Sequence, residues 1–515
     1  MGPAGRESLD AAERVVAHRY RFLNREIVIS REPEPDIHVN PLWTFQLHYL
    51  DHAIALAQNW RGSGSHRFGE ALMRVLRDWA GSTDDERVRL HPYPVAVRSL
   101  SLLKVLWLVE DFLPVELAGR VLGLVHRQLL WLEGNVEYHL MANHLQKNLQ
   151  ALVWGGLAFE GAEAERWRAR DSELWAQLFE QVLPDGGHFE RSPMYHAQAL
   201  VDFCETLALC RAAERPVPPG VEDRLARMAE AMVVLSRPDG TLHLFNDAAN
   251  GHGPDPSSAV ALASRVLGRE ASGPVGSVVL PETGYHALID PELGRRLIVD
   301  AGPPGPSYQP GHAHCDMLSV ELDLGGRPVV VDSGVHGYDG DPFREYARST
   351  RAHNTVSIGG KEQHEVWATF RMARRGDVVS ASSGESEGAW RFRGACHPYH
   401  DPNARHEREI VLRGEELRVE DRVTGASGAR LASWVHLHPD LEVEETDGVL
   451  VARTPDIELA IRPFGADSVR VVRGARDPAQ GWHFPEFGLA RPAAAVELAV
   501  EWNDGRTFGW TLARA

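Results

Sequence analysis

The chain has 515 residues, 43% of them hydrophobic and 24% charged, which is enough for two or three globular domains. Its formal net charge of −18 argues against nucleic acid as a general partner. No apolar run has the length of a bilayer-spanning helix, and 4 cysteines are too few for a disulfide framework. The first residues lack the pattern of a signal peptide, so we expect a cytoplasmic protein, or a periplasmic or secreted one whose leader was removed.

The first half of the chain, from about residue 8 to about residue 268, carries apolar residues at helical spacing. Short breaks rich in Pro, Gly and Asp separate the predicted helices, and strand patterns are scarce. Consecutive helices with short connections predict antiparallel pairs, arranged as a bundle or as a toroid of helical hairpins. The predicted helices are residues 42–57, 67–79, 95–109, 114–132, 144–159, 164–182, 196–213 and 221–235.

The second half has a hydrophobic period of two and many turn residues. This pattern predicts short antiparallel strands in a sandwich or in stacked sheets. A stretch rich in Gly, Pro and Ser at 268–278 separates the two patterns. We therefore predict an α-helical domain over residues 1–270 and an antiparallel β domain over residues 275–515.

Imidazoles and carboxylates are crowded in and after Gly311-His-Ala-His-Cys-Asp316. The two apolar runs that follow are predicted to pair as a hairpin through Gly325-Gly326, which would bring His314 next to Asp332. His353 opens a further predicted strand and would complete a set of two imidazoles and one carboxylate. Such a set suits zinc or a similar divalent ion. The alternative is three polar residues at strand ends that only solvate a loop.

Two polar segments stand out in the helical half. In the first, His139, Asn143 and Lys147 are four residues apart and would share one helix face, which is presented to a ligand or simply solvated. In the second, a Gly-rich turn at 185–187 leads into a helix with Tyr195 near its start. The alternative for Tyr195 is an aromatic residue at an interface.

An amide (Asn143), imidazoles (His144 and His312) and a phenol (Tyr195) suit proton abstraction next to a carboxylate. The amide would stabilise the enolate-like charge, and a phenol would return a proton to the leaving oxygen. The sequence has no nucleophile elbow, phosphate-binding loop or dinucleotide fingerprint.

These segments together resemble the heparinase II/III-like polysaccharide lyases, a superfamily that includes oligoalginate lyases and broad-spectrum glycosaminoglycan lyases. The resemblance covers about residues 40 to 420. It implies an incomplete α/α toroid followed by antiparallel β-sheets. The residues that carry it are Asn143-His144, Glu190-Arg-Ser-Pro-Met-Tyr195, Gly311-His-Ala-His-Cys-Asp316, Val331-Asp-Ser-Gly334 and Arg348-Ser-Thr-Arg-Ala-His-Asn-Thr355.

The resemblance also implies a role for each catalytic candidate. Asn143 would neutralise the uronate carboxylate, and His312 would help to bind and polarise the scissile linkage. Tyr195 would act as general acid, and as base for one C5 epimer. His144 would act as base for the opposite epimer. Lys147 is a departure, because several relatives carry an acidic residue there.

The resemblance implies one divalent metal ion and no organic cofactor. The ion would be zinc, with manganese or calcium as alternatives, and mainly structural. Its ligands would be His314, Asp332 and His353. The further residues expected to contact substrate are Gln46, His48, Arg98, His139 and Tyr338.

The expected activity is β-elimination on a uronic-acid-containing polysaccharide, with glycosaminoglycans (hyaluronan, chondroitin, heparan sulfate) ahead of alginate. The expected partner is this anionic polymer, with no nucleic acid and no membrane. Two alternatives stay open. One is a uronyl C5-epimerase on the same scaffold, and the other is a non-catalytic glycan-binding or exopolysaccharide assembly protein.

Overall fold

The computed structural model describes residues 6–32, 39–81, 91–426, 428–446, 448–503 and 505–515. The chain forms two compact units. The first unit comprises Met1–Leu178 and Glu205–Pro218, and the second comprises Phe179–Cys204 and Pro219–Ala515. Each unit is described by itself below.

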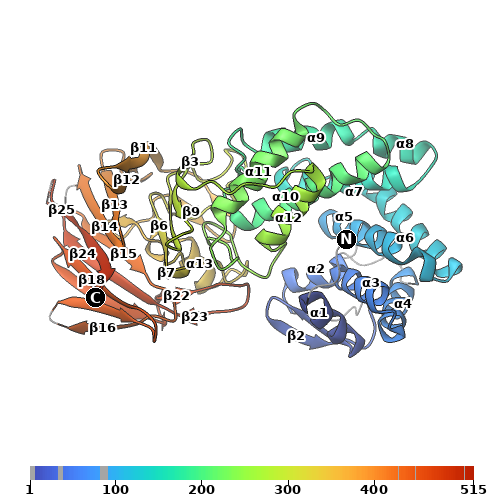
Figure 1. Ribbon diagram of the computed structural model, residues 1–515, viewed down its shortest axis with the longest axis horizontal. Helices are drawn as coiled ribbons and strands as arrows, with labels where there is room; N and C mark the ends of the chain where they lie inside the picture. Colours follow the sequence, from blue (N-terminus) through green and yellow to red (C-terminus); the bar gives the residue numbers. More distant parts are fainter. Residues whose placement is uncertain (1–5, 33–38, 82–90, 427, 447, 504) are drawn as a thin grey trace. The chain divides into compact units, whose positions relative to one another are not determined.

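Helices dominate the chain before the β-sheets of the second unit (Figure 1). The only strands described in this part form one short hairpin. In order, the elements are α1 (Arg6–Val16), β1 (Arg19–Phe22), β2 (Arg25–Val28), α2 (Pro41–Tyr49), α3 (Asp51–Ser63), α4 (His66–Ala80), α5 (Pro92–Val109), η1 (Glu110–Phe112), α6 (Val115–Glu133), α7 (Ala142–Ala158), α8 (Ala162–Arg168), α9 (Asp171–Gln181), α10 (Pro193–Ala212), α11 (Val221–Leu235) and α12 (Pro256–Leu267).

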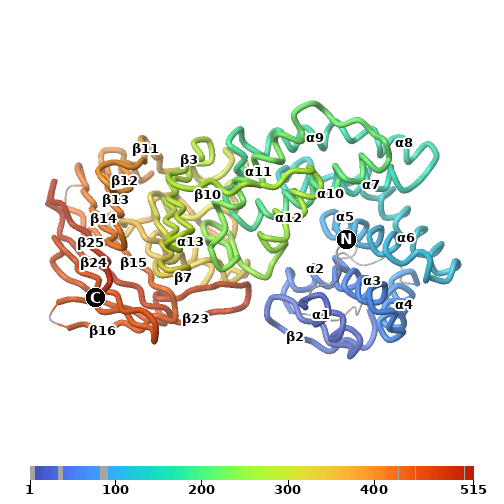
Figure 2. Tube along the Cα trace, viewed as in Figure 1, coloured from blue at the N-terminus to red at the C-terminus, as the bar shows by residue number. Residues whose placement is uncertain are grey.

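Alternate helices of the first unit pack against one another, and so do neighbours in sequence (Figure 2). Helix α3 contacts α5, and α5 contacts α7, while α4 contacts α6. Their apolar faces form one core that includes Leu56, Leu72, Leu103, Val125 and Leu152. This pairing is the pattern that a toroid of helical hairpins requires.

Several predicted helix boundaries are wrong. The predicted helix 42–57 is divided into α2 and α3, because Leu50 adopts a φ of 60° that no α-helix continues. The predicted helix 164–182 is likewise divided into α8 and α9. The hairpin β1–β2 was not predicted, since its strands have only four residues each.

Helix α12 was also not predicted, because its start lies in a stretch rich in Gly, Pro and Ser. The side chain of Asp255 accepts a hydrogen bond from the backbone N–H of Ser258, at 2.9 Å. Pro256 is the first helical residue, where its missing N–H costs nothing. The N-cap and the proline therefore start a helix where composition alone indicates a loop.

Antiparallel sheets make up most of the second unit (Figure 1). A five-stranded sheet has the order β3 (Gly276–Leu280), β4 (Tyr285–Asp290), β5 (Arg295–Asp300), β6 (Val320–Leu324), β7 (Arg327–Val330). A four-stranded sheet has the order β19 (Ser468–Arg473), β24 (Ala494–Glu501), β15 (Arg430–His436), β8 (Val356–Ile358). An eight-stranded sheet has the order β11 (Asp377–Ser386), β12 (Ala389–His397), β13 (Arg405–Arg413), β14 (Glu416–Thr424), β25 (Thr507–Arg514), β18 (Glu458–Phe464), β17 (Val449–Arg453), β16 (Glu442–Thr446).

Short elements complete the second unit. They are α13 (Pro342–Arg348), η2 (Thr350–Ala352), and the two-residue strands β9 (Val366–Trp367), β10 (Arg371–Met372), β20 (Ala475–Arg476), β21 (Ala479–Gln480), β22 (Trp482–His483) and β23 (Arg491–Pro492).

The inner faces of the three large sheets bury one common apolar core. It contains Leu322 of β6, Phe392 of β12, Val419 of β14 and Val496 of β24. Along β13 and β14 every second residue is buried, as the period of two predicts, whereas all residues of β6 are buried. The predicted fold class, helices followed by packed antiparallel sheets, is confirmed. In the part of the chain that the structure describes, none of the helices has the length and apolar character needed to cross a bilayer.

Candidate functional site

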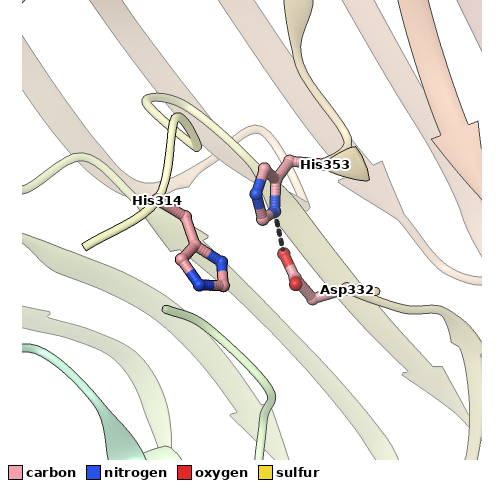
Figure 3. Close-up of side chains that lie close together, drawn as sticks. All are labelled: His314, Asp332 and His353. Carbon is pink, nitrogen blue, oxygen red and sulfur yellow. Dashed lines mark hydrogen bonds and ion pairs between the residues drawn. The ribbon is translucent and has the colours of Figure 1, made fainter. Parts of the chain in front are cut away.

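His314, Asp332 and His353 lie together in the second unit, and their side chains converge (Figure 3). One nitrogen or oxygen atom of each lies within 4.8 Å of the others, and all three residues are fully buried. Strands β6 and β7 pair antiparallel, and Gly325 and Gly326 supply the positive φ angles of 58° and 74° that the tight turn needs. The predicted hairpin is therefore present, and Asp332 follows its second strand.

Each imidazole of this cluster has one nitrogen engaged and one without a hydrogen-bond partner. His314 donates from Nε2 to Asp247 Oδ1 at 2.9 Å, while its Nδ1 is buried and unpartnered. His353 donates from Nδ1 to Asp332 Oδ2 at 2.7 Å, while its Nε2 is buried and unpartnered. A buried nitrogen without a partner is costly, and a metal ion would satisfy both. The cluster could therefore hold a metal ion.

The electrostatics of the cluster agree with this assignment. Burial lowers the pKa of His314 to about 3, which keeps its imidazole in the neutral form that binds metals. Burial also opposes a charge on His353, but the Asp332 carboxylate outweighs it and raises the pKa of His353 to about 9. A metal ion would replace that proton as the positive charge beside Asp332.

Tyr195, His312 and Tyr338 meet in the second unit as a separate group. The ring centroids of Tyr195 and His312 are 4.2 Å apart, and the two tyrosine hydroxyls form a 2.9 Å hydrogen bond. Tyr195 lies in the first turn of α10, as predicted. Burial raises the pKa of Tyr195 and of Tyr338 well above the usual range. Both phenols are therefore protonated at neutral pH, the state of a proton donor.

Asp247 connects this group to the cluster of His314, Asp332 and His353, and sequence reasoning missed it. Its Oδ2 accepts from His312 Nδ1 at 2.9 Å, and its Oδ1 accepts from His314 Nε2 at 2.9 Å. Arg344 donates to both oxygens. Burial alone would raise the pKa of Asp247, but Arg344 and the two imidazoles hold it well below its usual range. The carboxylate is therefore ionised.

The only sequence signal for this residue is a polar pair, Asn246-Asp247, inside the apolar run 244–249. The main chain of Asp247 is also fixed, because its N–H donates to His312 O at 3.0 Å and its carbonyl accepts from Ser192 Oγ at 2.6 Å. Asn246 accepts from the backbone N–H of His314 at 3.0 Å. Asp247 therefore contacts both the loop that carries His312 and His314 and the residue before α10, Ser192.

Asn143 and His144 lie at the start of α7 in the first unit, each half-buried. His144 donates from Nδ1 to Glu137 Oε1 at 3.2 Å, and its ring centroid is 4.8 Å from that of Tyr93. Asn148 Nδ2 donates to Glu137 Oε2 at 3.2 Å. Glu137 is buried and was missed by sequence reasoning, because its partners lie in a helix that begins five residues later.

The prediction that His139, Asn143 and Lys147 share one helix face is wrong for His139. Met141 has a φ of 61° and a ψ of −155°, so the helix begins only at Ala142. His139 lies in the exposed turn before it. Asn143 and Lys147 keep their spacing of one helical turn within α7.

Three further candidate substrate contacts lie in the first unit. Gln46 is half-buried in α2, whereas His48 and Arg98 are buried. Arg98 donates to the carbonyl of His48 at 3.4 Å, and its guanidinium lies 4.8 Å from the ring centroid of Trp79. Their roles in substrate binding stay predictions. The same holds for a groove shared by Asn143 and Tyr195, since these residues lie in different units.

Two family models match nearly the whole chain. The model described as "Heparinase II/III N-terminus" matches residues 12–257, and "Heparinase II/III-like, C-terminal" matches residues 273–511. A heparin-sulfate lyase of Pedobacter heparinus is 25% identical over 346 residues, which are 61% of this chain and 51% of that protein. The FtsZ-localized protein C of Caulobacter vibrioides is 26% identical over 377 residues, which are 66% of this chain and 60% of that protein.

The fold has clear counterparts among solved structures. A crystal structure of heparinase III superimposes with a TM-score of 0.78 at 17% identity, covering 98% of this chain and 84% of the other. Identity this low establishes a common fold and no more. The two curated relatives extend well beyond the matched part, since this chain spans only 51% and 60% of their lengths.

Proposed function

This chain belongs to the heparinase II/III-like family, and on that premise we propose that it cleaves a uronic-acid-containing polysaccharide by β-elimination. The observation that carries the proposal is the buried pair of phenols, Tyr195 and Tyr338, beside the imidazole of His312. We propose a glycosaminoglycan as substrate, with heparan sulfate first, because a matched relative is a heparin-sulfate lyase. Hyaluronan and chondroitin come next, and alginate follows.

In this mechanism Tyr195 would donate its proton to the leaving glycosidic oxygen, because burial favours its neutral form. The hydroxyl of Tyr338 would stabilise the phenolate left behind, through the hydrogen bond that already joins the two oxygens. His312 would bind the substrate near the scissile bond with Nε2, since its Nδ1 is engaged by Asp247.

The first unit would supply the other half of the chemistry. The amide of Asn143 would hydrogen-bond the uronate carboxylate and stabilise the charge that develops on proton removal. His144 would remove the C5 proton of one epimer, with its Nδ1–H held by Glu137 so that Nε2 is the basic atom. For the other epimer Tyr195 would act as base from its phenolate, the form that the hydrogen bond from Tyr338 stabilises, and would then return that proton to the leaving oxygen.

We propose zinc as the ion of the His314, Asp332 and His353 cluster, with manganese or calcium as alternatives. Two imidazoles and one carboxylate favour zinc, whereas calcium prefers oxygen ligands. Bound there, the ion would hold the loop that carries His312. No organic cofactor is required.

The test is a substrate panel of heparan sulfate, hyaluronan, chondroitin and alginate, followed by the ultraviolet absorbance of the unsaturated uronate. We expect product from at least one polymer and none from Tyr195→Phe, whose melting temperature should match that of the native protein. Native activity in Tyr195→Phe, or no product from any polymer with metal-loaded protein, would contradict the proposal.

Two other functions use the same scaffold. A uronyl C5-epimerase would incorporate solvent deuterium at C5 without chain cleavage. A non-catalytic glycan-binding or assembly protein is favoured by one observation, the match to a relative that bears the name FtsZ-localized protein C. Such a protein would bind polymer equally well with and without the Tyr195 hydroxyl, and would release no product.

A further inference from the structure

Two histidines on one short loop direct different nitrogens at the same carboxylate. His312 approaches Asp247 with Nδ1, and His314 approaches it with Nε2. Only Ala313 separates them in the chain. Arg344 donates to both oxygens of Asp247, and a carboxylate paired in this way only accepts hydrogen bonds, so both of these nitrogens carry the proton. The remaining nitrogens are then Nε2 of His312 and Nδ1 of His314.

These remaining nitrogens are the ones that the proposed roles require, metal binding for His314 and substrate binding for His312. Nδ1 of His314 is buried without a hydrogen-bond partner and belongs to the cluster with Asp332 and His353. Nε2 of His312 lies on the other side of its ring, whose centroid is 4.2 Å from that of Tyr195, with the two rings tilted by 35°. The imidazole of His312 is also the more accessible of the two, with 16% of its side chain exposed against none for His314.

We propose that Asp247 is a positioning residue that fixes the tautomers of His312 and His314 together, and so couples the cluster of His314, Asp332 and His353 to the substrate-binding imidazole of His312. This inference rests on the proposed roles of these two histidines. A carboxylate behind a metal-bound histidine is a common device, and its loss typically costs about 10–100-fold in metal affinity or activity. Here one carboxylate serves a metal ligand and a substrate-binding histidine at the same time.

Arg344 completes the arrangement. Its guanidinium donates to both oxygens of Asp247, so the carboxylate cannot rotate away from either imidazole. The same guanidinium donates to the carbonyl of Thr369 at 2.8 Å and lies 5.1 Å from the ring centroid of Tyr338. Arg344 therefore fixes Asp247 relative to the second tyrosine of the phenol pair.

The test compares native protein with Asp247→Asn. An amide of the same shape offers one acceptor and one donor, so one imidazole must adopt the opposite tautomer or lose its hydrogen bond. The first measurement is Co²⁺ binding to metal-free protein, followed by visible absorbance, and it requires no substrate. The second is the separation of kcat from KM on the polymer that the panel identifies. We expect Co²⁺ affinity and kcat to fall by about 10-fold or more, and KM to change less than about 3-fold.

The matched control is Asp421→Asn. Asp421 is fully buried, accepts from His406 Nε2 at 2.8 Å and binds Arg408 through both oxygens, at 2.7 and 2.9 Å. Like Asp247, it is a buried carboxylate paired with a histidine and an arginine, but among the described residues no hydrogen bond joins it to His312 or His314. We expect Asp421→Asn to lower the melting temperature. It should leave Co²⁺ affinity and kcat within about 2-fold of native, because Asp421 does not orient a proposed metal ligand through a hydrogen bond.

A second variant, Arg344→Lys, keeps the positive charge but removes the two-point contact, and should give a smaller effect in the same direction. The proposal is overturned if folded Asp247→Asn binds Co²⁺ with native affinity and keeps its native kcat. It is also overturned if Asp421→Asn lowers both quantities as much as Asp247→Asn does. Should the native protein cleave no polymer, the Co²⁺ measurement still decides the effect on His314, and the proposed lyase activity alone would fail.

Discussion

The hydroxyl oxygens of Tyr195 and Tyr338 lie 2.9 Å apart, although 143 positions separate the two residues in the chain. Tyr195 lies in the first turn of α10, and Tyr338 lies in the loop before α13. Burial raises the pKa of both phenols, so a phenolate on either one is costly unless the other donates to it. In the proposed reaction one hydroxyl would transfer the proton, and the other would stabilise the oxygen that has lost it.

Removing either hydroxyl should lower turnover, but by different amounts. Tyr195→Phe removes the proposed proton donor and should lower kcat by about 10²–10⁴-fold. Tyr338→Phe leaves that proton in place and removes one hydrogen bond to the phenolate, so a loss of about 10-fold is expected, equivalent to about 1.4 kcal/mol. The measurement is the initial rate of product absorbance at saturating polymer.

The control for these variants is Tyr346→Phe. Tyr346 is a fully buried tyrosine of α13 that makes no hydrogen bond to Tyr195 or Tyr338 among the described contacts. It should keep native kcat. A Tyr338→Phe variant that also keeps native kcat would show that the short contact between the hydroxyls has no part in turnover.

We predict that the cluster of His314, Asp332 and His353 binds one metal ion and that the stability of the protein depends on this ion. Elemental analysis should find about one equivalent of divalent metal, and a chelator should lower the melting temperature, because binding free energy adds to folding free energy. His353→Ala should lose the ion. His286→Ala is the control, since His286 is also buried but hydrogen-bonds to Ser383 at 2.8 Å outside the cluster. Equal metal content in both variants would exclude His353 as a ligand.

The sequence predicted the features that local patterns determine. The Gly325-Gly326 turn and the apolar runs around it are sufficient to place Asp332 near His314, and the period of two indicates the sheets. Leu50 could not be predicted as a helix break, because neither glycine nor proline marks it and only its φ of 60° separates α2 from α3. Tertiary packing overrides helix propensity at such positions.

The residues that sequence reasoning missed, Asp247 and Glu137, are buried carboxylates whose partners lie on other elements of the structure. Asp247 contacts Arg344 across 97 positions and His312 across 65. A single acidic residue within an apolar run is compatible with many roles, and only its neighbours in space decide among them. Motif spacing finds residues that lie on one element, whereas the carboxylates that orient them come from other elements.

Glu137 provides a test of the first unit. Glu137→Gln keeps the size of the side chain but removes the charge beside His144 Nδ1, at 3.2 Å. If His144 is the base, kcat should fall by about 10-fold or more on substrates with the epimer it serves, because a neutral amide stabilises the imidazolium less than a carboxylate does. Substrates of the opposite epimer, which rely on Tyr195, should lose less. The measurement is the ratio of initial rates on glucuronate-rich and iduronate-rich polymers.

Glu133→Gln is the control for this variant. Glu133 lies at the end of α6 and pairs with Arg166 on the surface, at 2.9 Å. Loss of a pair of this kind costs at most about 1 kcal/mol of stability, and it should leave the rate ratio unchanged. An unchanged ratio in Glu137→Gln as well would contradict the role of Glu137 in directing His144.

The stability of the protein should depend on pH through the ionisation of Asp421, which is buried beside Arg408 and His406. Burial opposes its charge, but Arg408 and His406 hold the pKa of Asp421 well below its usual range. A carboxyl whose folded pKa is depressed contributes stability above its unfolded pKa of about 3.9, and loses that contribution as pH falls toward the folded value. Asp421→Asn removes this dependence, and breaking a buried pair costs about 3–5 kcal/mol.

The gap in melting temperature between native protein and Asp421→Asn should therefore be constant from about pH 7 to about pH 5 and narrow below about pH 4. Other carboxyls also titrate in this range, but they titrate in both proteins, so the difference isolates Asp421. Asp290→Asn is the control, because Asp290 forms a half-buried pair with Arg295 near the surface. The difference in melting temperature between native protein and Asp290→Asn should be small at every pH. A gap for Asp421→Asn that stays constant to low pH would mean that its carboxylate is not held ionised by Arg408.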